Sequence, residues 1–289
     1  MTAMPPGLLP SRAPQTHKGD AGHVLMIAGA VGYSGAAALC TMGALRVGAG
    51  LVTLGLPKSL HDPMVEKLTE AMLSPLPETS KGSLSLQAYA PILDLIEQRD
   101  VVAIGPGLSQ HEETKELARR LAVKIVKPLV VDADGLNAMA EDVDLLKKRL
   151  LPMIMTPHPG EMGRLAKLSA HDVQQDRERI AQEFAKKYRV VVVLKGHDTV
   201  IANFDGTSVI NETGNPGMAS GGIGDVLTGM IAGLLAQKLE PFDAARLGVY
   251  LHGLAGDLAA KDRGEIGLLA SDLVDRIPQA IRQYQSMPV

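Results

Sequence analysis

Short apolar runs alternate with longer amphipathic stretches through most of this chain, and that alternation constrains the fold more than any other feature. The most apolar run, residues 190–194, consists of four valines and a leucine. Such a run is typical of a strand buried on both faces of a parallel sheet. The pattern predicts strands at 24–27, 51–54, 101–104, 129–131, 153–155, 190–194, 199–202 and 208–210. It predicts helices at 34–47, 85–97, 172–188, 225–237, 242–260 and 271–284.

The order of these elements predicts an α/β fold with a mostly parallel central sheet and helices on both faces. Ligands of such sheets bind at the carboxyl ends of the strands, so the loops after strands are the candidate sites. With no internal repeat or linker, residues 1–289 are expected to form a single domain, with 1–16 as a loose N-terminal lead-in. Ser109 and Glu112 are predicted to form a capping box at the start of another helix.

Charge and composition exclude several classes of function. Lysine and arginine number 29 against 32 acidic residues, with no basic run, so we expect no nucleic-acid partner. Residues 36–56 contain a single charge, Arg46, but glycines divide them, and a membrane span needs about 20 apolar residues. We therefore expect no membrane association. Cys40, the only cysteine, is predicted to be a buried, unreactive side chain in a cytoplasmic protein.

The strongest signal is a glycine-rich run at residues 211–225 that leads directly into a helix. Glycines let the backbone approach a ligand, and a helix N-terminus attracts anions. Asp225 at the end of the run has the chemistry of a base for an attacking hydroxyl. The alternative is a plain turn, with Asp225 as an ordinary residue of the first helical turn. The residues predicted to cradle a phosphate are Gly221, Gly222, Ile223 and Gly224.

A second loop, residues 156–161, follows another predicted strand. Pro157 and Pro159 fix its backbone and place His158 and Glu161 at the strand end. There His158 can hydrogen-bond a polar substrate, and Glu161 can hold hydrated Mg²⁺ through water. Alternatively, Glu161 only caps the helix that follows.

A third loop follows the most apolar strand and offers backbone amides, a cation and a hydroxyl, which suit a nucleotide phosphate or ribose. Alternatively it is only the turn of a hairpin. Its residues are Lys195, Gly196, His197, Asp198 and Thr199.

Smaller features complete the set. Residues 29–35 predict a flexible loop before a helix, and residues 105–107 a rigid strand end that allows close backbone contact. Residues 132–137 place Asp132 and Asp134 after a strand, where they can bind a metal, organise the site, or supply a helix cap and turn through Asp134.

Two residues in the predicted helix 242–260 are set aside. His252 lies in an apolar stretch and is expected to be packed and hydrogen-bonded, and Asp257 is expected to face elsewhere on that helix. The sequence contains no Walker A motif and no cluster of cysteine and histidine for zinc.

Taken together, residues 132–137, 156–161 and 211–225 resemble the motifs of the ADP/ATP-dependent NAD(P)H-hydrate dehydratases, a branch of the ribokinase-like superfamily. The resemblance runs from about His17 to the C-terminal helices. It implies a ribokinase-like fold and a repair reaction on NADH or NADPH whose nicotinamide ring has added water. A nucleotide phosphorylates the ring hydroxyl of the S-epimer, and phosphate then leaves to restore the dihydropyridine.

The resemblance also implies roles for individual residues. The substrate contacts map onto Ala36, Gly107, His158 and Asp225, with Asp225 as the base. The nucleotide contacts map onto Gly224 and the loop from Lys195 through Thr199. The family's bacterial-type members imply ADP as the phosphoryl donor, with Mg²⁺, so that AMP and phosphate are released.

Departures from the family pattern, and the family's partners, complete the expectations. Ile223 stands where the family usually has threonine or serine, which removes a hydroxyl expected near the phosphate, and Phe204 stands where proline is common. Many members carry an N-terminal epimerase domain, and nothing of that size precedes His17. A separate hydrate epimerase is therefore the expected functional partner, and a homotetramer the expected assembly.

Two rival functions remain open. A small-alcohol kinase of the same superfamily, of thiazole or pyrimidine type, would use the same Asp225 and glycine run but release a phosphorylated product. His158 argues against this, because thiazole kinases commonly have asparagine in the corresponding loop. A catalytically silent nucleotide-binding regulator would keep the Lys195 loop and could lose the base.

Overall fold

The computed structural model describes residues 7–151 and 153–287. Its nine-stranded sheet has the order β3-β2-β1-β4-β5-β6-β7-β8-β9, parallel from β3 to β7 and antiparallel at β8 and β9. This confirms the predicted mostly parallel sheet. The strands are β1 (His23–Ile27), β2 (Leu51–Pro57), β3 (Met72–Leu76), β4 (Val101–Ile104), β5 (Leu129–Val131), β6 (Met153–Met155), β7 (Val191–Leu194), β8 (Thr199–Ala202) and β9 (Ser208–Asn211).

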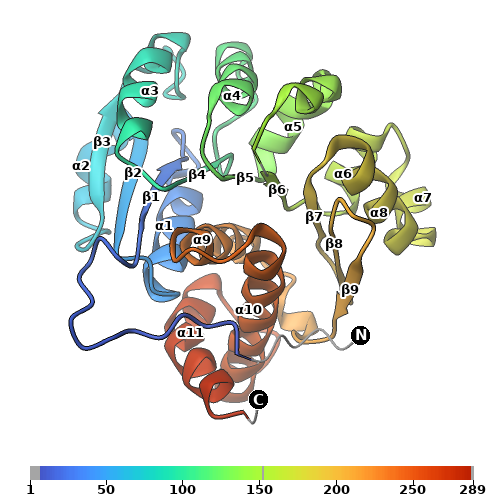
Figure 1. The fold of residues 1–289 in the computed structure, drawn as a ribbon. Helices are drawn as coiled ribbons and strands as arrows, with labels where there is room; N and C mark the ends of the chain where they lie inside the picture. The colour runs from blue at the N-terminus through green and yellow to red at the C-terminus, as the bar shows by residue number, and fades with distance from the viewer. Residues whose placement is uncertain (1–6, 152, 288–289) are drawn as a thin grey trace.

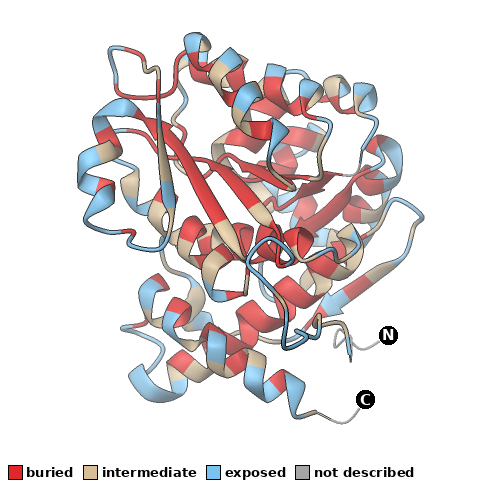
Figure 2. Ribbon diagram, turned by 60° about the vertical axis from the view of Figure 1, so that its left-hand side comes forward, coloured by how far each residue is buried: buried red, intermediate tan, exposed pale blue. Residues whose placement is uncertain are grey.

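Helices cover both faces of the sheet, as predicted, and each face has its own apolar core. One face carries α3, α4, α5, α6 and α8, and the other carries α1, α9, α10 and α11 (Figure 1). Buried residues concentrate in the strands and on the inner sides of these helices (Figure 2). The helices are α1 (Ser34–Arg46), α2 (His61–Val65), α3 (Tyr89–Glu97), α4 (Glu112–Lys124), α5 (Ala133–Glu141), α6 (Pro159–Ala166), α7 (Ala170–Gln175), α8 (Arg177–Tyr188), α9 (Ile223–Ala236), α10 (Pro241–Arg263) and α11 (Ala270–Gln285).

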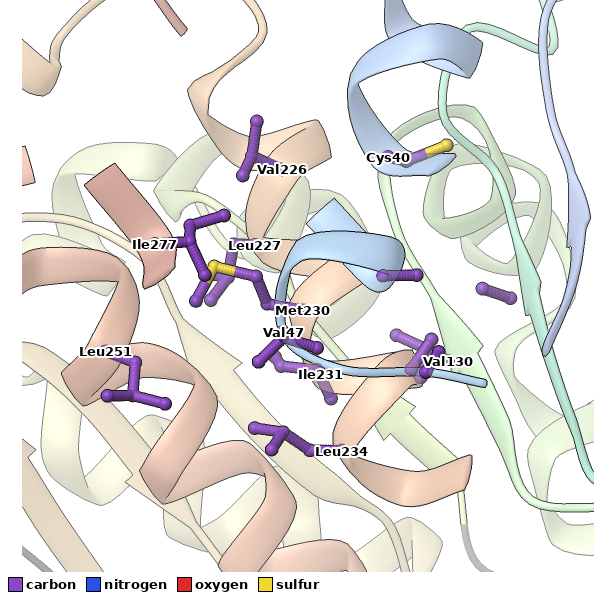
Figure 3. Close-up of a cluster of buried hydrophobic side chains, with 14 of the residues drawn as sticks. Cys40, Val47, Val130, Val226, Leu227, Met230, Ile231, Leu234, Leu251 and Ile277 are labelled. Atoms are coloured by element: carbon purple, nitrogen blue, oxygen red, sulfur yellow. The ribbon is translucent and has the colours of Figure 1, made fainter. Parts of the chain in front are cut away.

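Helix α9 is apolar on almost every side because it is buried between the sheet, α1 and α10. Figure 3 shows its side chains gathered with those of Val47, Leu251 and Ile277. Its glycines allow a very close approach of α1, since a Cβ atom on Gly229 would lie 1.9 Å from the carbonyl oxygen of Cys40. Cys40 is fully buried, as predicted, and burial raises the pKa of its thiol. This packing fixes the N-terminus of α9 in space.

Two helix predictions were wrong. The helix expected at 172–188 is two helices, because Asp176 leaves the helical conformation (φ −150°, ψ 61°) and Ser169 caps α7 separately. The expected capping box of Ser109 does not form, because Ser109 adopts φ 78° and lies outside the helix. The imidazole of His111 caps α4 instead, accepting from the amide of Glu113.

Strand β3 and helix α2 were missed. Strand β3 contains Pro75, which interrupts the apolar pattern and is tolerated because the strand lies at the edge of the sheet, paired only with β2. Helix α2 spans only five residues, too few for a helical period to show.

The described part of the N-terminal lead-in, residues 7–16, contains no helix or strand. It is nevertheless bound to the body of the protein, since the amide of Leu8 donates to the hydroxyl of Tyr284 at 3.1 Å and Arg12 donates to the carbonyl of Gly48. Residues 1–6 of the predicted lead-in lie outside the described residues. Among the described residues, no helix is both long enough and apolar enough to cross a bilayer.

Candidate active site

The N-terminus of α9 is open at the end of the glycine-rich run. Gly222 is the N-cap with φ 91°, and among the described residues no side chain caps this helix. Those amides have no acceptor within the helix, and the helix dipole makes them attract an anion. The predicted cradle residues Gly221, Gly222, Ile223 and Gly224 therefore surround an unblocked helix N-terminus.

The Ile223 side chain turns into the protein interior rather than toward solvent. It is only 6% exposed and packs in the apolar core around α9. Its carbonyl oxygen accepts from Nε2 of His252 at 2.9 Å. His252 is thus buried and hydrogen-bonded, as predicted, and burial lowers its pKa to about 4. At residue 223, the side chain packs in the core, and only the backbone is placed at the N-terminus of α9.

Asp225 lies in the first turn of α9, half-buried beside the opening. Burial raises the pKa of Asp225 to about 7, and the negative charges of Asp132, Asp134 and Glu161 add to the effect, while Lys195 opposes it. A carboxyl group with this pKa gains and loses a proton near neutral pH, as general-base catalysis requires.

Lys195 and Asp132 form an ion pair beneath the first turn of α9. The Nζ atom of Lys195 lies 2.7 Å from Oδ1 of Asp132, and Thr228 donates to the other carboxylate oxygen at 2.6 Å. A Cβ atom on Gly224 would lie 3.3 Å from the same Nζ. Burial alone would lower the pKa of Lys195, but the carboxylates of Asp132 and Glu161 outweigh it and raise that pKa. A fixed positive charge therefore lies close to the open helix N-terminus.

The rest of the Lys195 loop faces solvent. Gly196, His197 and Asp198 are exposed, and the Thr199 hydroxyl donates to the carbonyl of Gly196 at 2.9 Å. Asp198 adopts φ 55°. The loop therefore has a partly buried ammonium group at Lys195 and an exposed backbone turn after it, and the Thr199 hydroxyl is already used within that turn.

His158 and Glu161 start α6 as a capping box. The Nδ1 atom of His158 accepts from the amides of Gly160 and Glu161, and the Glu161 carboxylate accepts from the amide of His158 at 2.8 Å. Burial and the charges of Lys195 and Arg164 lower the pKa of His158. Because Nδ1 accepts from two amides, the neutral ring carries its proton on Nε2, which lies 3.5 Å from Oε1 of Glu161. That half-exposed ring can donate a hydrogen bond to a substrate.

Glu161 caps α6, which is one of the two roles that the sequence left open. Besides capping α6, it lies 3.9 Å from Nζ of Lys195 and is 6% exposed, and burial raises its pKa. Among the described residues, no three His, Cys, Asp or Glu side chains are grouped so that they could hold a metal ion. Lys195 and Thr228 occupy both oxygens of the buried Asp132 carboxylate, which leaves Glu161 as the carboxylate that could hold hydrated Mg²⁺ through water.

Gly107 and Ala36, predicted to contact the substrate, meet at the neighbouring strand end. Gly107 adopts φ 63°, and a Cβ atom there would lie 3.0 Å from the Cβ of Ala36. Ala36 lies in α1, and a Cβ atom on Gly222 would lie 2.4 Å from Cδ1 of Leu39 in the same helix, so the start of α1 lies beside the start of α9. The structure thus brings both residues to the same side of the sheet edge as Asp225.

Asp134 organises the loop before α4. It accepts from the amide of Ser109 at 2.8 Å and from the side chain of Gln110, while Asn137 donates to it at 3.4 Å. The N-cap position of α5 belongs to Asp132, so the predicted cap role of Asp134 is wrong.

Asp257 was set aside wrongly. Its carboxylate accepts from the amide of Gly214 and from Nδ2 of Asn215, both at 3.0 Å, and so anchors the glycine-rich run to α10. The sequence held one signal, since Asp257 is the only charged residue between Arg246 and Lys261. A lone carboxylate in an apolar helical stretch needs hydrogen-bond donors from elsewhere.

Comparison with known proteins gives a consistent result. A sequence model of a family described as NAD(P)H-hydrate dehydratase matches residues 24–279. The bifunctional NAD(P)H-hydrate repair enzyme of Moorella thermoacetica is 48% identical over 277 residues, which are 96% of this chain and 52% of that protein. The enzyme of the same name from Thermofilum pendens is 44% identical over 274 residues, 95% of this chain and 52% of that protein. The chain therefore spans about half the length of these curated relatives.

Solved structures agree. The ADP/ATP-dependent NAD(P)H-hydrate dehydratase from Bacillus subtilis, co-crystallised with ATP and Mg²⁺, superposes with a TM-score of 0.83 at 34% identity, covering 96% of this chain and 94% of that one. This likeness confirms the predicted ribokinase-like architecture. The family match includes every candidate site residue from Ala36 to Asp225, and the chain belongs to the NAD(P)H-hydrate dehydratase family.

Proposed function

We propose that this chain is a nucleotide-dependent dehydratase that returns the S-epimer of hydrated NADH or NADPH to the working cofactor. The observation that carries the proposal is Asp225, a carboxylate with its pKa raised to about 7 at the open N-terminus of α9. The Lys195 ammonium beneath the same helix turn adds the positive charge that a transferring phosphoryl group needs.

The reaction has two steps. Asp225 accepts the proton of the ring hydroxyl while the hydroxyl oxygen attacks the terminal phosphorus of ADP, and the bond to the bridging oxygen breaks to release AMP. The amides of the first turn of α9 and Lys195 stabilise charge on the phosphoryl oxygens. The ring nitrogen then supplies electrons to expel phosphate, and the adjacent ring carbon loses a proton to water, which restores the double bond.

The nucleotide is proposed to bind along Gly224 and the exposed backbone of residues 196–199. Glu161 would hold hydrated Mg²⁺ through water, and the ion would neutralise phosphate charge. The solved Bacillus subtilis relative was co-crystallised with ATP and Mg²⁺, which supports nucleotide and magnesium use. ADP as the preferred donor rests on the resemblance to bacterial-type members.

Three further proposals concern the setting of the protein. A cytoplasmic location is supported by its single, fully buried cysteine. A homotetramer and a hydrate epimerase as functional partner are supported by the family resemblance, and mass measurement in solution tests the tetramer. The name of the Moorella relative, a bifunctional repair enzyme, is consistent with a second repair activity acting beside this one.

The deciding experiment incubates the protein with hydrated NADH, Mg²⁺ and either ADP or ATP, and follows the return of dihydronicotinamide absorbance. Recovery that needs nucleotide, with release of phosphate, is the expected result, and the better donor identifies the nucleotide preference. A stable phosphoester in place of phosphate would instead show a small-molecule kinase. Nucleotide binding without turnover of the hydrates would exclude the dehydratase function, and the small-molecule kinase and the nucleotide-binding regulator would then be the two remaining functions.

A further inference from the structure

An open surface cavity lies near the start of α6. Its volume is about 540 Å³, and its walls come from the loop before α4, from α5 and from α6. Volumes of about 300–1,000 Å³ are usual for pockets that hold small molecules. The lining residues are Gln110, Asn137, Ala140, Glu141 and Arg164.

Hydrogen bonds connect this cavity to the site. Gln110 and Asn137 both donate to Asp134, whose charge contributes to the raised pKa of Asp225. On the other wall, a Cβ atom on Gly160 would lie 2.9 Å from Cε1 of His158 and 3.9 Å from Nη1 of Arg164. The cavity therefore continues the His158 side of the site.

Arg164 gives this cavity a free positive charge. Its Nε atom donates to Oδ1 of Asn137 at 2.8 Å, which orients the guanidinium and leaves its two terminal nitrogens available. In the part of the chain that the structure describes, Arg164 forms no ion pair with a carboxylate. The other charged lining residue, Glu141, is already paired with Lys115 at 2.6 Å and with Arg119.

We propose that this cavity binds a phosphate of the hydrated dinucleotide, with Arg164 as the residue that contacts it. A planar guanidinium pairs with phosphate oxygens through two parallel hydrogen bonds. The inference rests on the proposed function, because the hydrated ring must lie between His158 and Asp225 and the rest of the dinucleotide must extend from there. The donor nucleotide is proposed to occupy the opposite side, along residues 196–199.

The test compares Arg164→Ala and Arg164→Lys with the unaltered protein. We expect Arg164→Ala to raise the KM for the hydrated dinucleotide about tenfold or more, with the KM for ADP and kcat nearly unchanged, and Arg164→Lys to lie between. Arg120→Ala is the matched control, because Arg120 is an exposed arginine of α4 paired only with Glu116 and outside the cavity. Thermal unfolding of each variant checks that the fold is kept.

The two hydrates identify the phosphate. An effect on hydrated NADH and NADPH alike assigns Arg164 to the pyrophosphate, and an effect on hydrated NADPH alone assigns it to the 2′-phosphate. Unchanged KM values for both hydrates in folded Arg164→Ala would overturn the proposal. Calorimetric titration of the hydrates without nucleotide gives the same comparison through Kd. If the unaltered protein shows no turnover, the proposed function fails. The assignment of Arg164 is still tested, because the Kd values of the hydrates do not depend on turnover.

Discussion

The two halves of the glycine-rich run are held in opposite ways. The anchored half, residues 211–217, is tied to α10 by hydrogen bonds. The Asp257 carboxylate accepts from the amide of Gly214 and the side chain of Asn215, and the Thr213 hydroxyl donates to the backbone carbonyl of Tyr250. The open half, residues 221–224, leads into α9 without a side-chain cap. The run is therefore fixed by hydrogen bonds at its start, whereas at its end the backbone amides of the first turn of α9 have no side-chain cap.

This difference between the two halves explains how the site can be rigid and still have free amides that bind a phosphate. Amides aimed at a phosphate help catalysis only if they are already in place, because reorganisation during the reaction would cost free energy. The anchored half and the close packing of α1 on α9 supply that rigidity, since neither contributes a group to the opening itself. Substitutions in the two halves should therefore separate activity from stability.

The largest effect is expected at Asp225. Asp225→Asn should lower turnover by about 10²–10⁴-fold, because it removes the proton acceptor, with little change in nucleotide affinity. Single-turnover rates and the Kd of ADP check both parts. Unchanged turnover would show that Asp225 is not the base, while nucleotide binding could still hold.

Lys195→Ala should come next, because Lys195 serves both the open half and the ion pair. We expect weaker ADP binding and a loss of about 3–5 kcal/mol in the free energy of unfolding, since the Asp132 carboxylate stays buried without its partner. Lys195→Ala combined with Asp132→Asn should regain stability without regaining ADP affinity. Unchanged ADP affinity in the single variant would rule out the nucleotide role of Lys195.

Asp257→Ala is the corresponding test of the anchored half. It leaves the amide of Gly214 and the side chain of Asn215 without their acceptor, and we expect a loss of about 1–3 kcal/mol in the free energy of unfolding. Turnover at saturating substrate should change far less than in Asp225→Asn. Denaturant unfolding measures the first effect, and a fall in turnover as large as that of Asp225→Asn would erase the distinction between the halves.

The pH dependence of Asp225 sharpens the same contrast. Its folded pKa of about 7 exceeds the ordinary value of 3.8, so its contribution to stability is full below pH 3.8 and is lost as pH rises through about 7. Asp225→Asn should therefore gain stability relative to the unaltered protein at pH 8 but not at pH 4. The kcat/KM of the unaltered protein should fall about tenfold per pH unit below 7. Equal pH dependence of the melting temperatures of the two proteins would contradict the assigned pKa.

The fold was predictable wherever burial made the sequence pattern continuous. Strands such as residues 101–104 were found because both of their faces are apolar. Edge strand β3 was missed because Ser74 and Pro75 interrupt the pattern at the edge of the sheet. The break at Asp176 was missed because the helical period continues across it, and only the backbone conformation shows the end of α7.

The site was predictable as a set of loops but not as a set of contacts. Glycines, prolines and a carboxylate after strands identified Asp225 and the 156–161 loop, because parallel strand ends share one edge of a sheet. The ion pair of Lys195 with Asp132 joins residues 63 positions apart, and no spacing rule connects them. Asp257 was missed for the same reason, since its partners lie 43 and 42 positions away in a loop.

The finest test exchanges one glycine for alanine in each half. In the open half, a Cβ on Gly224 would lie 3.3 Å from Nζ of Lys195, whereas alanine suits the helix itself. Gly224→Ala should therefore raise the KM for nucleotide several-fold with stability kept, because the methyl group intrudes between Lys195 and the phosphate. In the anchored half, Gly214 adopts φ 109°, so Gly214→Ala should cost about 1–2 kcal/mol through backbone strain and leave that KM nearly unchanged. If both variants lost the same stability and showed the same change in the KM for nucleotide, the two halves of the run would have the same role. That result would contradict the assignment of residues 221–224 as a phosphate cradle.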